Sequence, residues 1–183
     1  MPLMLETERL LMREWRAEDF AAFYAMNRDP EVRRYYAGLQ SLAQAHDFMV
    51  RALERDARDG FFFQPVFEKE TGAFVGDLGL AKIDFEAPFK GGTEIGWMLQ
   101  QAYWGRGYAV EMATALLNYA VTELMLDEVL VLAFTVPSNH RSRRVMEKLG
   151  MQRDPEGDFE NPMIPDGHPY RAHVLYRIGL AGA

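Results

Sequence analysis

The feature that most constrains this chain is a pair of glycines around one arginine, Gly105-Arg106-Gly107. Thr93 to Leu99 before it reads as a buried strand, and a helical pattern starts just after it. Glycine lets the backbone turn sharply and expose consecutive N–H groups, and the helix adds unpaired first-turn N–H groups and the positive end of its dipole. The unit predicts a site for a phosphate or pyrophosphate, with a plain strand-to-helix turn as the alternative.

Two common phosphate-binding motifs do not fit this turn. The chain contains no G-x-x-x-x-G-K-[ST], the loop of ATP- and GTP-hydrolysing enzymes. Gly105-x-Gly107 also lacks the third glycine of the dinucleotide motif. A different kind of phosphate-bearing ligand is therefore expected.

The composition describes one ordinary globular domain. With 183 residues, 49% hydrophobic and 26% charged, the chain is long enough for a substantial core, and we find no linker, repeat or low-complexity segment. We therefore expect a single domain over residues 1–183. No apolar run approaches the ~20 residues of a membrane helix, and the N-terminus does not resemble a secretion signal, so we expect a cytoplasmic protein without a membrane partner.

The cysteine, histidine and charged-residue content argues against several kinds of site and partner. The absence of cysteine excludes disulfides, thiolate metal sites and a cysteine nucleophile. The histidines lack zinc spacing, and Pro155 and a missing glycine argue against a calcium loop among the acids after Gln152, so no metal is expected. The net charge of -7 argues against nucleic-acid binding and is compatible with a cationic amine substrate.

The hydrophobic pattern predicts an α/β fold with a mixed sheet. Ser41 with Gln44 has the form of a capping box, and Gly60 suits a helix C-terminus. Gly76 and Gly79 indicate a bulge or the close approach of another backbone. The expected elements are a strand over 7–15, a short helix from 17, a helix from 41 to 60, a hairpin of 61–69 and 73–83, a strand over 93–99, a helix over about 108–124, a strand over 129–136, a helix over 139–149, a loop over 154–168 and a strand over 171–178.

Three stretches resemble the GNAT acetyltransferase superfamily. Trp104 to Ala109 is similar to its acyl-coenzyme A loop, Gln/Arg-x-x-Gly-x-Gly/Ala, with Trp104 in place of the first Gln or Arg. The run from Val136 to Met151, with an Asn, a Ser three residues later and a closing Lys-Leu-Gly, resembles the helix that flanks the coenzyme thiol. Glu6 to Arg13 resembles the first strand of the branch of ribosomal-protein N-terminal (Rim-type) acetyltransferases.

The resemblance implies a fold and a coenzyme site. The fold is a GNAT-like domain with a mixed, mostly antiparallel sheet, helices on both faces and a splayed central strand pair, Thr93–Leu99 and Val129–Val136. Backbone groups around Trp97, Met98 and Leu99 would bind the pantetheine and the thioester carbonyl. The pyrophosphate would be bound by N–H groups of Trp104, Gly105, Arg106, Gly107, Tyr108 and Ala109. The Arg106 side chain either adds its charge or is a solvated loop arginine.

The acid that protonates the leaving thiolate is less clear. Many members of the superfamily use a tyrosine at the position that is Met146 here, and methionine has no proton to donate. We expect Ser142, one turn earlier, to take that role, with a helix cap or a surface hydroxyl as the alternative. Asn139 is a helix cap, a coenzyme ligand or both.

Two carboxylates are candidates for the base that deprotonates the amine. Glu94 lies on the strand before the glycine turn, where burial would raise its pKa towards a useful value. Glu160 lies in the loop expected near the end of the chain. The ribosomal-protein acetyltransferases that this chain resembles have an acid in that loop. We favour Glu94 because a strand holds a base more rigidly than a loop.

The resulting functional hypothesis is an acetyl-CoA-dependent N-acetyltransferase that transfers an acetyl group directly to a primary amine. The partners would be acetyl-CoA and the amine, which is either a peptide or protein N-terminus or a small molecule. The amine would approach opposite the coenzyme, between the early helices and the late loop. The alternative is a non-catalytic acyl-CoA-binding regulatory module, which Met146 favours slightly. The sequence does not identify the amine, the length of the acyl group or the choice between monomer and homodimer.

Overall fold

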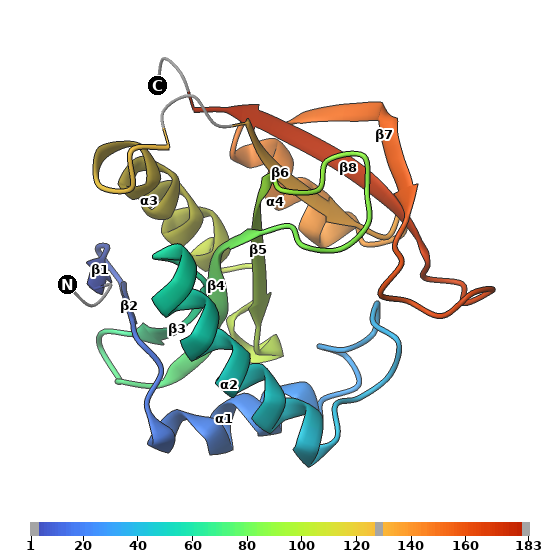
Figure 1. Cartoon of the computed structure of the whole chain (residues 1–183). Coiled ribbons are helices and arrows are strands. Elements are labelled where there is room, and N and C mark those ends of the chain that lie inside the picture. Colours follow the sequence, from blue (N-terminus) through green and yellow to red (C-terminus); the bar gives the residue numbers. More distant parts are fainter. Residues whose placement is uncertain (1–3, 127–129, 181–183) are drawn as a thin grey trace.

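A computed structural model describes residues 4–126 and 130–180. In these ranges eight strands form one sheet in the order β1-β2-β3-β4-β5-β6-β8-β7 (Figure 1). The strands are β1 (Met4–Glu6), β2 (Leu10–Arg13), β3 (Phe63–Glu68), β4 (Phe74–Lys82), β5 (Thr93–Leu99), β6 (Leu130–Thr135), β7 (Gln152–Glu160) and β8 (Ala172–Gly179). The helices are α1 (Phe20–Asn27), α2 (Leu42–Asp59), α3 (Tyr108–Thr122) and α4 (His140–Lys148), with 3-10 turns at Ala17–Asp19 and Gln101–Tyr103.

The sheet opens between β5 and β6. These strands form the parallel pair of the sheet and are matched at Thr93 with Val131 and at Glu94 with Leu132. β5 continues to Leu99 without β6, so the two strands diverge, as Figure 1 shows. The expected splayed pair and the mostly antiparallel mixed sheet are confirmed. Val129, the expected first residue of the second strand, lies outside the described residues.

Helices cover both faces of the sheet, as expected. α3 and α4 pack on one face, where Met112 and Met146 join Leu78 and Ile95 in one buried cluster. α1 and α2 pack on the other face, where Phe23 and Ala45 belong to a second cluster. Because side chains alternate along a strand, β4 and β5 each present one set of residues to α3 and another set to α1 and α2.

Local signals in the sequence explain several boundaries. The Ser41 hydroxyl oxygen accepts a hydrogen bond from the Gln44 backbone amide, and Gln44 Oε1 accepts one from the Ser41 backbone amide, which confirms the capping box of α2. Gly60 ends that helix with a φ of 80°. A Cβ at Gly76 would collide with the backbone oxygen of Met98, so the predicted close approach of another backbone is also confirmed.

Two expected boundaries are wrong. The first strand, expected over 7–15, is shorter, Leu10–Arg13 (β2), and a further strand, Met4–Glu6 (β1), precedes it and pairs with it antiparallel. The loop expected over 154–168 begins too early, because β7 extends to Glu160 and pairs with β8. Its register is irregular between Asp154 and Phe159, so Pro155 and Gly157 fall in a bulged stretch at the sheet edge, where a missing N–H is tolerated.

Within the described residues, no helix combines the length and the apolarity needed to cross a membrane.

Candidate active site

The glycine turn before α3 presents a row of free amides. Gly105 and Gly107 have φ values of 76° and 81°, in the left-handed region that favours glycine. The first helical bond of this end runs from the Glu111 amide to the Gly107 oxygen, at 3.0 Å. Among the described residues, none accepts a hydrogen bond from the N–H groups of residues 105–110. Free amides at the positive end of the α3 dipole have the chemistry needed to bind an anion.

Trp104 ties this turn to the end of β5. Its indole Nε1 donates to the backbone oxygen of Leu99 at 2.8 Å. The guanidinium of Arg141, from the first turn of α4, lies 4.4 Å from the centre of the Trp104 ring. Trp104 therefore connects the turn both to β5 and to the helix across the opening, which gives a structural role to the residue that departs from the acyl-coenzyme A loop pattern.

The Arg106 side chain does not extend freely into solvent. Its Nη1 lies 3.5 Å from Glu68 Oε1, and the same carboxylate accepts a hydrogen bond from the Tyr108 hydroxyl at 2.5 Å. In this structure Glu68 thus holds both side chains beside the turn, and the backbone amides are left as the free donors.

The exposed edge of β5 begins where β6 diverges. From Ile95 to Leu99 that edge has no strand partner on the β6 side within the described ranges. The side chains of Trp97 and Leu99 pack with the α3 cluster, whereas Met98 packs with the α1–α2 cluster. Backbone groups on this edge are thus available to an extended ligand that enters the opening.

Asn139 and Ser142 lie at the start of α4. Asn139 Oδ1 accepts from the Ser142 amide at 3.3 Å, and its Nδ2 donates to Thr135 Oγ1 at 3.0 Å, so Asn139 is confirmed as the helix cap. Ser142 is half-buried, and its hydroxyl has no hydrogen-bond partner among the described residues. Met146 is 1% exposed and belongs to the core.

Glu94 is half-buried on the sheet face that α1 and α2 cover. Burial raises the pKa of Glu94 to about 7, with Asp84 adding to the rise and Arg55 opposing it. Its carboxylate has no hydrogen bond or ion pair within the described part of the chain. A carboxyl with this pKa can accept a proton near neutral pH.

Glu160 has a different environment from the expected one. It is the last residue of β7 rather than part of a loop, its side chain is 63% exposed, and its carboxylate lies 3.4 Å from Arg171 Nε. Asp158 on the same strand pairs with Arg153. Both acids near the end of β7 are therefore already paired with arginines, which leaves Glu94 as the better placed carboxylate.

One buried acid was missed by the sequence analysis. Asp77 on β4 is 7% exposed, and burial raises its pKa to about 7 while Arg33 opposes the rise. Tyr36 lies close by, with the Arg33 guanidinium 4.1 Å from its ring centre. The signal was a single acid between Gly76 and Gly79 in an otherwise apolar strand, where an ionisable residue is rarely fully buried without a reason.

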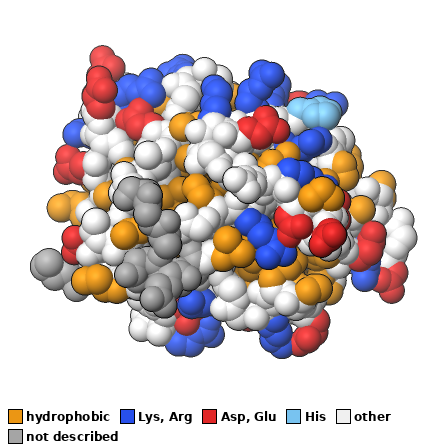
Figure 2. All heavy atoms as spheres, turned by 90° about the horizontal axis from the view of Figure 1, so that it is seen from above, with side chains coloured by type: hydrophobic (Ala, Val, Ile, Leu, Met, Phe, Trp, Pro, Cys, Tyr) orange, Lys and Arg blue, Asp and Glu red, His pale blue; other side chains and the backbone are white. Residues whose placement is uncertain are grey.

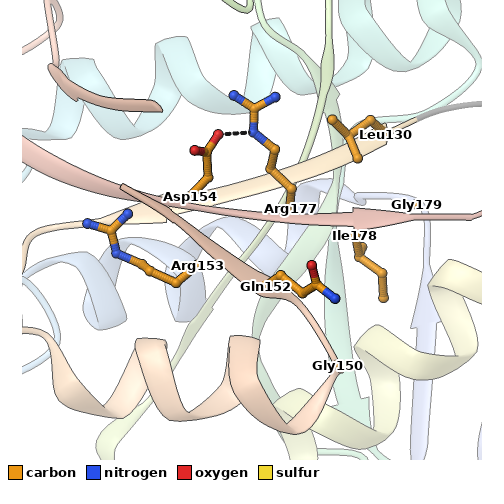
Figure 3. A pocket seen from close by; sticks show the side chains of 8 residues that line it. All are labelled: Leu130, Gly150, Gln152, Arg153, Asp154, Arg177, Ile178 and Gly179. Carbon is orange, nitrogen blue, oxygen red and sulfur yellow. Dashed lines mark ion pairs between the residues drawn. The ribbon is translucent and has the colours of Figure 1, made fainter. Parts of the chain in front are cut away.

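A surface hollow of about 580 Å³ lies away from these residues (Figure 3). Arg177 and Asp154, which form an ion pair, line it together with residues of β6, β7 and β8. Figure 2 shows acidic and basic side chains interspersed over the face seen from above. None of the sequence-predicted site residues lines this hollow. A much smaller one, of about 10 Å³, lies between α3 and β4 and is lined by Asp77, Leu99, Tyr108 and Ala109, among others.

Comparison with known proteins identifies the family. The model of the acetyltransferase (GNAT) domain matches residues 9–152. The chain belongs to the GNAT acetyltransferase family. This acetyltransferase is 33% identical over 175 residues to "Uncharacterized N-acetyltransferase YnaD" of Bacillus subtilis (strain 168), an alignment that covers 95% of each protein.

Solved structures of GNAT enzymes share its fold. The acetyltransferase (GNAT family) from Bacillus anthracis superposes with a TM-score of 0.77 and 29% identity, covering 97% of this chain and 99% of that one. RimJ of Mycobacterium smegmatis, in complex with CoA-disulfide, superposes with a TM-score of 0.70 and 21% identity, covering 97% of this chain and 85% of that one. The GNAT-like fold is confirmed, a Rim-type enzyme shares that fold, and the chain is an N-acetyltransferase.

Proposed function

We propose that this enzyme transfers an acetyl group from acetyl-CoA directly to a primary amine, and that the two substrates meet at the opening between β5 and β6. The observation that carries the proposal is the row of free amides at residues 105–110 beside the exposed edge of β5. Free amides beside an exposed strand edge suit a ligand with a pyrophosphate joined to an extended arm, which is the form of coenzyme A.

The coenzyme's interactions follow from this arrangement. N–H groups from Gly105 to Ala109 bind the pyrophosphate, and backbone groups around Trp97, Met98 and Leu99 bind the pantetheine and the thioester carbonyl. The Trp104 N–H, also expected to bind the pyrophosphate, already donates to the Gln101 oxygen at 3.1 Å. Asn139 and Ser142 face the thiol end from α4. Support comes from the Arg141–Trp104 contact, which brings the first turn of α4 to the glycine turn.

In the proposed reaction, the amine first loses a proton to Glu94, directly or through a water. The amine nitrogen then attacks the thioester carbon, so that a C–N bond forms and the C–S bond breaks. Ser142, directly or through a water that it orders, gives a proton to the departing thiolate and regains one from the nitrogen, which loses its second proton as the amide forms. The raised pKa of Glu94 supports its role, and the unpartnered hydroxyl of Ser142 supports the second proton transfer. Glu160 is less suited, because Arg171 neutralises its charge.

The chemical class of the amine that accepts the acetyl group is also proposed. The resemblance to Rim-type enzymes favours a peptide or protein N-terminus, and a small-molecule amine is the other option. On the α1–α2 face, aromatic side chains lie near the β6 residue that pairs with Glu94, namely Phe85, Phe89, Phe134 and Phe159. They would form an apolar wall for the acceptor. A cytoplasmic location is proposed with this function, because acetyl-CoA and new protein N-termini occur together there.

Release of free thiol from acetyl-CoA tests the function. A panel of peptide N-termini, amino acids and small amines should contain at least one compound that raises the release well above background hydrolysis. The same compound with its amine already acetylated is the control and should have no effect. A wild-type protein that binds acetyl-CoA but releases no thiol with any amine would support the regulatory module, in which the acyl-CoA site persists without transfer.

A further inference from the structure

Asp77 is a buried carboxyl that the reaction described above does not use. It is 7% exposed, and no described residue forms a hydrogen bond or an ion pair with it. An ionised carboxylate buried without a partner is costly, and folded proteins normally pair such groups. An unpaired acid of this kind at an active site indicates a ligand that supplies the missing partner.

The strand register places Asp77 next to the reacting centre. Asp77 lies directly opposite Met98 in the β4–β5 pair, and Met98 belongs to the exposed segment proposed to hold the thioester carbonyl. Glu94 lies four residues before Met98, about 13 Å along the strand. Alternation puts Asp77, Met98 and Glu94 on the same face, so Asp77 is the carboxylate closer to the thioester.

Arg33 and Tyr36, from the segment between α1 and α2, lie near Asp77 without pairing with it. Arg33 donates from Nε to the Gly38 oxygen at 3.0 Å and lies over the ring of Tyr36. Its charge is near enough to lower the pKa of Asp77, yet no ion pair joins the two among the described residues. Burial raises the pKa of Tyr36 to about 12, Arg33 opposes the rise and the charges of Asp77 and Glu94 add to it, so the Tyr36 hydroxyl lies within electrostatic reach of both carboxylates.

We propose that Asp77 binds the ammonium of the acceptor beside the thioester, so that the enzyme recognises its acceptor as a cation. Asp77 holds the nitrogen beside the thioester, and Glu94, about 13 Å away along the strand, takes its proton through intervening waters rather than by direct contact. Tyr36 and Arg33 form the wall of this subsite on the side of the α1–α2 segment. This inference rests on the proposed function, since it assigns the acceptor side of the same site.

The first test needs no activity. Thermal unfolding of the wild type, Asp77→Asn and the exposed control Asp47→Asn should be compared at several pH values. A buried carboxyl with a raised pKa destabilises the fold as pH rises from its ordinary range to about 7, because the unfolded chain releases the proton in this range while the folded state still holds it. Asp77→Asn should therefore have a higher Tm than the wild type near pH 8, and the difference should shrink towards pH 5. Asp47→Asn should follow the wild type.

The second test separates charge from shape. The best amine of the panel is compared with its aminooxy analogue, in which the CH2 next to the nitrogen is replaced by oxygen, so that the nucleophile is uncharged at neutral pH. Asp77→Asn should raise KM for the amine about 10- to 100-fold, the cost of losing one hydrogen bond to a charged group. KM for the aminooxy analogue and the Kd of acetyl-CoA should stay unchanged.

The possible results are distinct. If no amine is acetylated by the wild type, the proposed function fails, and the unfolding series still tests whether Asp77 is an unpaired buried acid. If the wild type is active but Asp77→Asn changes KM equally for both nucleophiles, or for neither, the inference is overturned. A Tm of Asp77→Asn at or below that of the wild type near pH 8 overturns it as well.

Discussion

Trp104 donates its indole N–H to the backbone oxygen of Leu99 at 2.8 Å, and thereby joins the glycine turn to the last residue of β5. The turn carries the free amides, and β5 carries the exposed edge. The two parts of the proposed coenzyme site are therefore connected by one side chain. Their relative position should depend on that bond.

We expect Trp104→Phe to weaken acetyl-CoA binding beyond its effect on stability. Loss of the hydrogen bond should lower the free energy of unfolding by about 1 kcal/mol. Trp15→Phe is a matched control, because Trp15 Nε1 donates to the Phe63 oxygen of β3 at the same 2.8 Å and so does not join the glycine turn to β5. Calorimetric titration should show a higher Kd for acetyl-CoA in Trp104→Phe alone. Equal Kd values in the two variants would show that the bond does not position the turn.

Ser142→Ala should lower kcat about 100-fold, the low end for general acid catalysis, with the Kd of acetyl-CoA nearly unchanged. The expected cause is loss of the proton donor to the thiolate. Ser138→Ala, in the exposed turn before Asn139, should leave kcat as it is. Because the Asn139 cap bonds to the backbone amide of residue 142 rather than its hydroxyl, stability should change little. An unchanged kcat in Ser142→Ala would remove Ser142 from the reaction.

The pH dependence of kcat should identify the base. Burial raises the pKa of Glu94 to about 7, and a base must be deprotonated to act, so kcat at saturating acceptor should rise with pH towards a plateau above that value. Glu94→Gln should abolish this rise, whereas Glu160→Gln should retain it, since Glu160 is paired with Arg171. Loss of the rise in Glu160→Gln alone would reverse the assignment, and its survival in both variants would exclude catalysis by either carboxylate.

Some of these features could be predicted from the sequence because they depend on local chemistry. The positive φ values of Gly105 and Gly107 follow from residues that favour them, and the Ser41 capping box is a local pattern. The burial of Glu94 followed from its place in a strand. In each case, nearby residues contain the information.

Other features depend on contacts between distant parts of the chain. β7 has Pro155, Gly157 and several acids, and it forms a strand because β8 pairs with it. The same pairing brings Arg171 to Glu160. The sequence predicts that Glu160 lies in a loop, and it gives no sign of this partner. Asp77 is of interest because its buried carboxylate has no hydrogen-bond or ion-pair partner among the described residues. The positions of the segments around it decide this, and the sequence does not give those positions.

Binding of acetyl-CoA at the glycine turn is the central claim, and thermal unfolding with and without acetyl-CoA tests it most directly. At about 100 times its Kd, the ligand should add roughly 2.7 kcal/mol to the stability of the wild type. Gly107→Val should lose this gain, because a branched side chain disfavours the φ of 81° and obstructs the amides. As a control, Gly60→Val has a similar φ of 80° at the end of α2 and should keep the full gain. A wild-type protein with no shift at saturating acetyl-CoA, or a Gly107→Val variant with an undiminished shift, would contradict the claim.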